Sequence, residues 1–399
     1  MNIGELPSIE LQMSLLLFVA LGGYLLASRI NQSAVVGEIL IGLIVGPSFL
    51  NLITYTDFVQ SIAALGAVIL MFVIGFEFNI KELSNIKFGI IGFSGVIIPW
   101  ICGYFIAVLF GFDFISALFI GTALTATSIA ITANVLREMC LLDTEVAKAI
   151  IGAAVIDDVL SLLALSITAD VASGSFSYTG IALSIVKQVG FLLIAGIIGI
   201  VFISKWIEKI DKTRLAMKNP EFVFIFVMMI AFLFATLSEY VGISAIIGAF
   251  IAGVSFNGVN LKHSHDIEAG ADFLYIIFGS IFFVSLGILV DIHVMTQEAV
   301  VFLVVLTIAA VITKLIGCSI PAKIMGYSGR DSLAIGFGMS PRGEVAMIVA
   351  LMGLTMGLIG QGVYAAIVLM SLITTILTPI LFRNWLFKKE VIACDLENK

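Results

Sequence analysis

Long apolar runs alternate with short polar clusters over almost the whole chain. Each run has roughly the 20 residues that an α-helix needs to cross the hydrocarbon core of a bilayer. The pattern predicts thirteen membrane-spanning helices, at about residues 9–29, 34–50, 57–78, 87–110, 114–136, 146–170, 179–205, 221–240, 243–257, 272–290, 299–320, 331–356 and 363–387. The ninth run is short, and polar residues interrupt the fifth and the twelfth. We therefore expect an all-α polytopic membrane protein.

The composition indicates a chain that is solvated mostly by lipid. Of its 399 residues, 61% are hydrophobic and 12% are charged, and the mean hydropathy is +1.19. Soluble domains of this size do not have that balance. The spans leave no room for a soluble catalytic domain, and the sequence has no phosphate-binding glycine loop, nucleophile elbow or dinucleotide fingerprint. We expect neither an enzyme nor a cofactor, and no nucleic-acid partner.

The cysteines are scattered, without the CxxC spacing of metal or redox sites. They are Cys102, Cys140, Cys318 and Cys394. We expect them to be packing or surface residues rather than metal ligands or disulfide partners.

Basic residues are distributed unevenly among the loops. Nearly all lie in the odd-numbered loops or in the tail after the last span, and the even-numbered loops contain essentially none. They are Arg29, Lys81, Lys87, Arg137, Lys148, the cluster at 205–218, Lys262, Lys323, Arg330, Lys388 and Lys389. Basic residues favour the cytoplasmic side of a membrane. The distribution predicts a multi-pass protein of the cell membrane, with its N-terminus outside and its C-terminus in the cytoplasm.

Three stretches of the first half recur in the same order in the second half. Residues 33–42 match 244–253, residues 70–75 match 282–287, and the polar breaks at 125–128 and 340–343 follow similar Ile-Gly pairs. Matched stretches lie an odd number of spans apart, so the two copies must have inverted topology. Inverted repeats with a binding site near the bilayer midplane are typical of alternating-access transporters. Chance likeness between apolar segments explains one such match more readily than three in order.

The repeat divides the chain into four predicted parts. Each of the two repeats contains one interrupted span. They are a first inverted repeat of six spans at 9–171, a linker helix with a basic cytoplasmic loop at 172–218, a second inverted repeat of six spans at 219–388 and a short cytoplasmic tail at 389–399.

Asp157 and Asp158 lie side by side inside the apolar run from about residue 147 to residue 169. A carboxylate at the centre of a bilayer costs about 2.5–3.5 kcal/mol on insertion scales. Two adjacent carboxylates therefore need a counter-charge, a proton or a bound cation. A protein that alternates between those partners would exchange a cation for protons. We predict that Asp157 and Asp158 bind the cation and the proton.

Both interrupted spans carry residues that loosen helical hydrogen bonding. They are Thr125, Ala126, Thr127 and Ser128 in the fifth span, and Ser340, Pro341, Arg342, Gly343 and Glu344 in the twelfth. Carbonyl groups freed by such breaks can coordinate a cation, and half-helix ends present partial charges to it. We expect discontinuous helices here, with Thr127 and Ser128 contributing to the cation site. A proline kink with small hydroxyl residues packed against a neighbouring helix is the alternative.

Lys314 lies deep in the eleventh run, too far from its ends for the ammonium to reach water comfortably. A buried ammonium needs an anionic partner, and the paired aspartates are the obvious one. A lysine that reaches the cytoplasmic surface near Lys323 is the alternative. Arg342 and Glu344 also need partners, either each other or a third group. We expect those two to hold the broken helix rather than to bind the transported ion.

Taken together, these motifs resemble the monovalent cation:proton antiporter-2 family, which covers bacterial and archaeal sodium/proton antiporters and the membrane part of glutathione-gated potassium efflux systems. The matching stretches span nearly the whole chain: 36–48, 75–77, 125–128, 157–158, 282–287, Lys314 and 340–344. The resemblance implies a thirteen-helix fold in which a core domain holds two crossed broken helices and moves like an elevator against a dimerisation domain. It also implies that Asp158 is the main cation ligand, and that Asp157 pairs with Lys314 until the cation enters.

Potassium-efflux members of that family carry Gln in place of the first aspartate and append a nucleotide-binding domain. This chain has Asp157 and a short tail instead, which favours sodium. We predict a secondary active transporter that exchanges a monovalent cation, with Na⁺ ahead of Li⁺ or K⁺, for protons by alternating access, as a homodimer in the lipid bilayer. The alternative is a potassium/proton antiporter or a potassium efflux pathway. A gated channel is disfavoured because no repeated carbonyl-filter motif is present.

Overall fold

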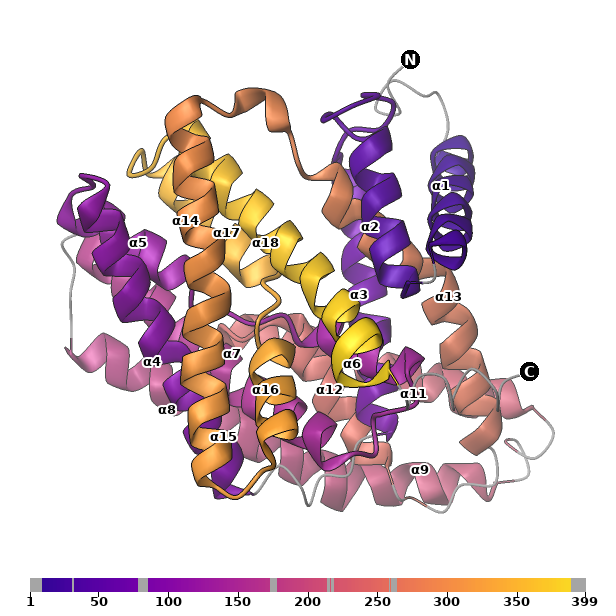
Figure 1. Ribbon diagram of the computed structural model, residues 1–399. Coiled ribbons are helices and arrows are strands. Elements are labelled where there is room, and N and C mark those ends of the chain that lie inside the picture. The colour runs from indigo at the N-terminus through magenta and orange to yellow at the C-terminus, as the bar shows by residue number, and fades with distance from the viewer. Residues whose placement is uncertain are drawn as a thin grey trace. The chain divides into compact units, whose positions relative to one another are not determined.

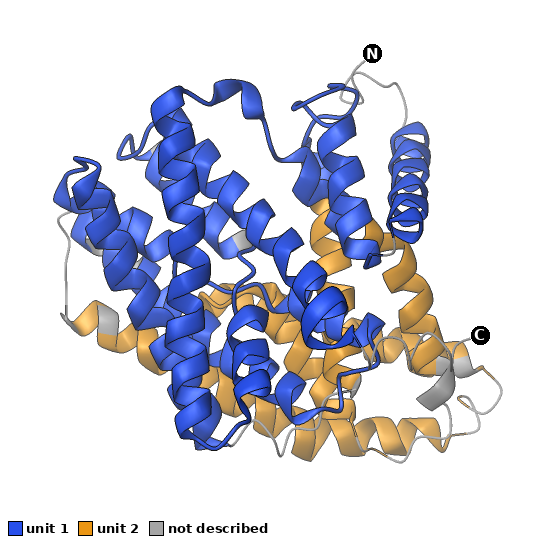
Figure 2. Ribbon diagram, in the orientation of Figure 1, with its two compact units in different colours: residues 1–59, 85–177, 283–399 blue, residues 60–84, 178–282 orange. Residues whose placement is uncertain are grey.

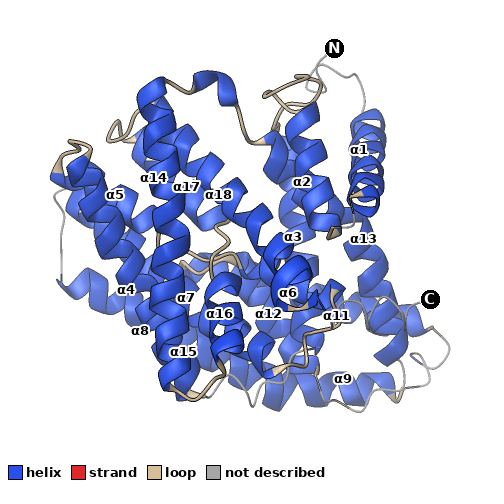
Figure 3. Cartoon of the chain, in the orientation of Figure 1, coloured by secondary structure: helices blue, strands red, loops and turns tan. Residues whose placement is uncertain are grey.

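The protein is helical throughout the part of the chain that the computed structural model describes. That part comprises residues 9–30, 32–77, 85–172, 178–213, 216, 219–257, 259 and 264–388. Within these ranges the helices are joined by loops and turns, and no strand is present (Figure 3).

The helices follow the order of the apolar runs (Figure 1). The α-helices are α1 (Ile9–Arg29), α2 (Ala34–Val45), α3 (Asp57–Glu77), α4 (Ile86–Leu109), α5 (Phe114–Ala123), α6 (Ile129–Glu138), α7 (Glu145–Ala172), α8 (Tyr178–Ile197), α9 (Ser204–Asp211), α11 (Pro220–Val241), α12 (Ala245–Phe256), α13 (Ser264–Ile288), α14 (Gln297–Lys314), α15 (Ile320–Ile324), α16 (Gly329–Gly338), α17 (Glu344–Thr355) and α18 (Gln361–Leu381). The other helical segments are a 3-10 helix at Ile292–Val294 and π-helices at Ile198–Ile203, Leu315–Ser319 and Phe382–Leu386.

Nine of the described helices are long and apolar enough to cross a membrane, and four shorter apolar helices accompany them. The shorter ones are α2, α5, α12 and most of α17. The fifth predicted span divides into α5 and α6, and the twelfth divides into α16 and α17. Each predicted run therefore corresponds to a helix or a helix pair, and the prediction of an all-α polytopic fold is confirmed.

Local signals explain where several helices begin and end. The carboxylate of Asp113 precedes α5 and accepts hydrogen bonds from the backbone N–H groups of Ile115 (3.1 Å) and Ser116 (3.5 Å). Such a cap satisfies N–H groups that have no partner within the helix. At its C-terminal end, α11 stops at Gly242, whose φ of +86° lies in the left-handed region that glycine adopts without strain.

The chain forms two compact units (Figure 2). Unit 1 comprises Met1–Val59, Asn85–Ser177 and Phe283–Lys399, and unit 2 comprises Gln60–Ser84 and Tyr178–Phe282. Each unit combines segments from both predicted repeats. Compact packing therefore does not follow the repeat boundaries, which remain a prediction. All predicted site residues belong to unit 1.

In unit 2, glycines bring α3 and α12 into close contact. A Cβ atom at Gly75 would overlap the carbonyl oxygen of Phe250, and a Cβ atom at Gly253 would overlap that of Phe72. Only a residue without a side chain permits this approach of two backbones.

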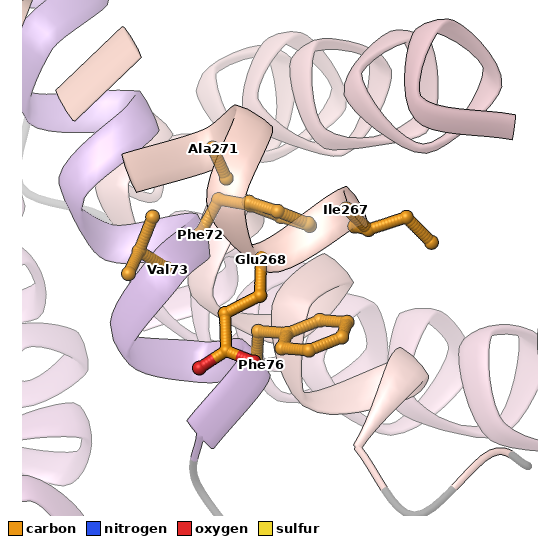
Figure 4. Close-up of a pocket in the computed structure, with 6 residues that line it drawn as sticks. All are labelled: Phe72, Val73, Phe76, Ile267, Glu268 and Ala271. Carbon is orange, nitrogen blue, oxygen red and sulfur yellow. The ribbon is translucent and has the colours of Figure 1, made fainter. Parts of the chain in front are cut away.

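A pocket between α3 and α13, also in unit 2, has partly aromatic walls (Figure 4). It is lined by Phe72, Val73, Phe76, Ile267, Glu268 and Ala271. Among the described residues that line it, Glu268 is the one with an ionisable side chain, and none is a predicted site residue.

One expectation about the cysteines is wrong. Cys140 is disulfide-bonded, whereas Cys102 and Cys318 are free. Cys394 lies outside the described residues. Spacing along the chain carries no information about which distant cysteine the fold brings near, and this is why the sequence did not reveal the bond.

Candidate ion-binding site

The two broken spans meet at their breaks, within unit 1. The backbone N–H of Ser128 donates to the carbonyl oxygen of Pro341 (2.9 Å), and Oγ1 of Thr127 donates to the carbonyl oxygen of Met339 (3.1 Å). The two discontinuous helices are therefore hydrogen-bonded to each other where both backbones leave helical geometry.

Ser340 and Gly343 shape the break of the second span. A Cβ atom at Gly343 would lie 2.6 Å from Oγ of Ser128, so a side chain there would push the two breaks apart. The hydroxyl of Ser340 donates to the carbonyl oxygen of Gly336 (2.8 Å), which adds a bond to the last turn of α16. The next helix begins at Glu344, whose side chain lies outside the part that the structure describes.

Arg342 places a positive charge at the carbonyl end of α5. Its Nη1 donates to the carbonyl oxygens of Thr125 (3.2 Å) and Ala126 (2.9 Å), and its Nη2 donates to that of Ala310 (3.2 Å). Cations are stabilised at helix C-termini, where carbonyl groups lack partners. The sequence left the partner of Arg342 open between Glu344 and a third group, and the structure provides these carbonyl groups.

Asp157 places a negative charge at the start of α6. Its Oδ2 accepts a hydrogen bond from the backbone N–H of Thr127 (2.9 Å), just before that helix begins. An anion is stabilised at a helix N-terminus because the first N–H groups have no partner within the helix. Arg342 and Asp157 thus provide charges of the right sign to both helix ends that the break of the fifth span exposes.

Lys314 reaches the same carboxylate from the end of α14. Its Nζ donates to Oδ1 of Asp157, and both side chains are 0% exposed. The structure therefore brings these two residues together and does not direct Lys314 to the surface near Lys323. A buried pair of this kind needs good geometry and further hydrogen bonds to offset the loss of hydration. The N–H of Thr127 supplies one such bond.

The remaining predicted ligands lie close to Asp157 in the chain or in space. Asp158 follows it on α7 and is 5% exposed, as is Thr127, and Ser128 is half-buried. These side chains and the carbonyl groups of the breaks offer oxygen ligands, which hard cations prefer. In the described ranges, no three His, Cys, Asp or Glu side chains gather as a metal-binding group would. The arrangement suits a proton or a cation held by oxygen atoms.

Hydroxyl groups of α18 support the second break, and the sequence analysis missed them. The backbone N–H of Arg342 donates to Oγ1 of Thr374 (3.2 Å), and Oγ1 of Thr375 donates to the carbonyl oxygen of Arg342 (3.0 Å). Thr378 donates to the carbonyl oxygen of Phe337 (3.0 Å). Hydroxyl residues three and four positions apart lie on one face of a helix. That spacing within an apolar run was the signal available in the sequence.

Comparison with known proteins shows which family the chain belongs to. The family described as sodium/hydrogen exchanger, transmembrane, matches residues 15–388. The probable Na⁺/H⁺ antiporter GerT of Bacillus cereus is 35% identical over 367 residues, covering 90% of this chain and 94% of that protein. The Na⁺/H⁺-K⁺ antiporter GerN of the same organism is 32% identical over 365 residues, covering 89% and 90%.

The fold has also been seen in a solved structure. The sodium proton antiporter MjNhaP1 from Methanocaldococcus jannaschii is similar with a TM-score of 0.72 and 18% sequence identity, over 98% of this chain and 99% of that one. At that identity the likeness concerns the fold alone. Because the family match extends over almost all of the spans, the protein belongs to the sodium/hydrogen exchanger family.

Proposed function

We propose that the protein is a secondary active transporter that exchanges Na⁺ for protons across the cell membrane. The observation that carries this proposal is the buried carboxylate of Asp157, bonded to Lys314 and to the N–H of Thr127, with Asp158 next to it. Carboxylates in such a place must hold a proton, a metal cation or an ammonium group. The name of GerT, a probable Na⁺/H⁺ antiporter, supports the choice of ions.

Competition for the two carboxylates would couple the ions. When Asp157 and Asp158 release protons, a cation can enter with Asp158 as its main ligand, and Lys314 then leaves Asp157. When protons return to the carboxylates, they displace the cation, and Lys314 again lies beside Asp157. Adjacent carboxylates titrate together, so the proton affinity belongs to the pair rather than to either residue.

Alternating access follows from the same charges. An uncompensated pair of carboxylates is unfavourable in a low-dielectric barrier, so only proton-loaded or cation-loaded states should cross it. The uneven distribution of basic residues supports an outside N-terminus and a cytoplasmic C-terminus.

We further propose a homodimer in the bilayer. Large apolar side chains of α1, among them Phe18 (71% exposed) and Leu21 (56% exposed), need lipid or a second copy to cover them.

Potassium is the second candidate cation. The relative GerN, at 32% identity, is named as an Na⁺/H⁺-K⁺ antiporter, which makes a K⁺ branch of the cycle a specific alternative. The aspartate at position 157 supports sodium, because the resemblance to potassium-efflux systems would place Gln there.

A flux assay tests the proposal. The full chain is reconstituted into proteoliposomes with a pH gradient, and Na⁺, Li⁺ and K⁺ are added in turn while choline keeps the ionic strength constant. Na⁺ should dissipate the gradient, and Asp158→Asn should abolish the response without unfolding the protein, since it removes the charge and keeps the shape. Asp143→Asn, at an exposed turn, is the matched control and should respond like the wild type. A response to K⁺ alone would establish the second candidate, and no response to any cation would reject exchange.

A further inference from the structure

Pro321 changes the helical geometry that follows Lys314. Proline has no backbone N–H, and its ring crowds the carbonyl group four residues earlier, which here is that of Gly317. Over Leu315–Ser319 the chain is π-helical, and α-helical geometry resumes at Ile320. A π turn contains more residues than an α turn, so it changes the relative directions of the side chains before and after it. The orientation of Lys314, directly before the turn, therefore depends on it.

Ser94 of α4 supplies a side-chain donor to the carbonyl of Gly317, which cannot accept an α-helical N–H bond from the proline four residues on. Its Oγ lies 2.6 Å from the carbonyl oxygen of Gly317 and 2.7 Å from that of Ile90 in its own helix. Ile90 is already positioned to receive the helical N–H of Ser94. Gly317, by contrast, faces a proline four residues on, so the hydroxyl satisfies a carbonyl group that α-helical bonding cannot.

Close contacts enclose the π turn on two sides. A Cβ atom at Gly317 would lie 2.8 Å from the carbonyl oxygen of Ser94 on α4. On α16, a Cβ atom at Gly336 would overlap Oγ of Ser319 and lie 3.2 Å from Cα of Leu315. The π turn is therefore packed closely against the backbones of both α4 and α16.

The surface of α4 that contacts the π turn also borders the ion pair. A Cβ atom at Gly95 would lie 2.7 Å from Sγ of Cys318, and 3.6 Å from both Oδ1 of Asp157 and Nζ of Lys314. Adjacent residues of α4 therefore touch the π turn and form one wall of the pair.

We propose that Ser94 is a positioning residue for Lys314. Its hydrogen bond to Gly317 fixes the π turn and thereby sets how closely the ammonium approaches Asp157. The more closely the ammonium of Lys314 lies to Asp157, the more strongly it competes with a cation for that carboxylate. The described part of the chain has two other π turns, at Ile198–Ile203 and Phe382–Leu386, and neither follows a buried lysine. A π turn alone does not indicate a positioning role, so the inference depends on the contacts of Ser94 with Gly317 and of α4 with the ion pair.

The carboxylate has its own supports, which makes the inference testable. Asp157 belongs to α7 and is bonded to the N–H of Thr127, and neither of these contacts involves Ser94 or the π turn. Loss of the Ser94 hydroxyl should therefore weaken the hold on the lysine and leave the carboxylate in place.

Ser94→Ala tests the inference, which rests on the proposed exchange of Na⁺ for protons. In proteoliposomes, the Na⁺ concentration for half-maximal proton flux should fall by about three- to tenfold, the range for one hydrogen bond. The reason is that a loosened ammonium competes less with the cation. A purely structural role would reduce the maximal rate or the thermal stability and would not improve the apparent affinity. An unchanged or raised half-saturation concentration would overturn the inference.

Two further variants serve as rescue and control. Ser94→Thr keeps the hydroxyl and should restore the wild-type half-saturation concentration. Ser255→Ala removes a buried hydroxyl of unit 2 that donates within its own helix, to Ile251 (2.7 Å), and should leave that concentration unchanged.

Lys314→Ala separates the two proposals. If it lowers the half-saturation concentration and Ser94→Ala does not, the positioning role is wrong and the exchange mechanism stands. If Lys314→Ala has no effect, the competition mechanism itself is wrong.

Pro321→Ala provides a test that does not depend on the folding of the Ser94 variant. The new N–H can satisfy Gly317 within its own helix, so the π turn should relax and the half-saturation concentration should again fall. Because both changes act through the same carbonyl group, Ser94→Ala combined with Pro321→Ala should shift it no further than the larger single effect. Additive shifts would show that the two residues act separately and would contradict the inference.

Discussion

Asp157 accepts hydrogen bonds from two donors of different kinds. The backbone N–H of Thr127 is fixed at the start of α6, whereas the ammonium of Lys314 ends a flexible four-carbon stem. Burial of both charges costs several kcal/mol per ion, which their mutual attraction offsets only in good geometry. Such a pair contributes little net stability but is costly to break on one side. It is therefore suited to a site where one cationic partner replaces another.

Lys314→Ala should lower the free energy of unfolding by about 3–5 kcal/mol, because it leaves the carboxylate of Asp157 buried without a counter-charge. In the Asp157→Asn background the same change should have a much smaller effect. Denaturant unfolding in detergent measures both losses. Lys212→Ala is the control, because Lys212 pairs with Glu208 at an exposed position, where a pair contributes less than about 1 kcal/mol. Equal losses in the two backgrounds would mean that Lys314 and Asp157 are not coupled.

At the scale of elements, each discontinuous helix relies on its neighbours for partners that its own break removes. The fifth span receives charges from Arg342 and Asp157, and the twelfth receives hydroxyl groups from Thr374 and Thr375 of α18. In lipid, backbone polar groups that lose their helical partners must find others inside the protein. The breaks are therefore stable only when packed within unit 1.

Thr375→Val removes one of these partners and nearly preserves the shape of the side chain. The carbonyl group of Arg342 loses its donor at 3.0 Å, so the free energy of unfolding should fall by about 1–3 kcal/mol. Thr307→Val is the matched control, since its hydroxyl donates within its own helix, α14, to the carbonyl oxygen of Leu303 (2.7 Å). Thermal unfolding of both variants in detergent measures the difference. Equal changes would remove the special role of the α18 hydroxyls.

The cap of α5 should make stability depend on pH. The pKa of the Asp113 carboxyl lies below its ordinary value, chiefly because the Ser116 hydroxyl donates to it. A lowered folded-state pKa means that the contribution is fully present above the pKa of the unfolded chain, about 3.9, and is lost as the pH falls through the folded-state pKa.

Asp113→Ala should therefore lower the free energy of unfolding at neutral pH by about 0.5–1 kcal/mol, the low end for a cap because the carboxylate is exposed and screened by solvent. The difference in unfolding free energy between the variant and the wild type should narrow below the folded-state pKa. Unfolding measured at neutral pH and at a pH below that pKa tests this, with Ser116→Ala as a partial mimic that removes the main donor to the carboxylate. A gap that stays constant would assign the effect to packing.

At the scale of the whole molecule, the helix arrangement tolerates extensive change in sequence. It is similar to that of MjNhaP1 at 18% identity. A lipid-facing position requires only an apolar side chain, and a span requires only sufficient length, so many sequences meet both demands. The buried charges have no such freedom, because each depends on a particular partner.

Transport should be electrogenic. If Lys314 and both aspartates change partners in one cycle, the proton-loaded and cation-loaded forms can carry different net charge across the membrane field. A membrane potential is then worth about 2.3 kcal/mol per elementary charge per 100 mV. Cation-driven proton flux in proteoliposomes should therefore respond to a potential imposed with valinomycin and a K⁺ gradient. If neither rate nor end point changes when the potential is set to zero or reversed, exchange is electroneutral and Lys314 is a fixed structural charge.

The spans and the breaks can be predicted from the order of residues along the chain. Run length and hydropathy suffice for the helices, because lipid forces every span to be apolar and internally hydrogen-bonded. Proline, glycine and hydroxyl residues act on their own segment, so the interruptions at 125–128 and 340–344 were visible too. The contact of Lys314 with Asp157 was predictable for a different reason, since few charges lie deep in the apolar runs and few pairings were possible.

The neutral groups that these charges and breaks contact depend on how the helices pack in three dimensions. Carbonyl groups and hydroxyls are abundant in the chain, so no local pattern could assign Arg342 to Thr125, Ala126 and Ala310, or Ser94 to Gly317. Those choices depend on how α4, α14 and α18 pack around the two breaks. They require backbones to approach closely at glycines far apart in the chain, and periodicity along one helix says nothing about its neighbour.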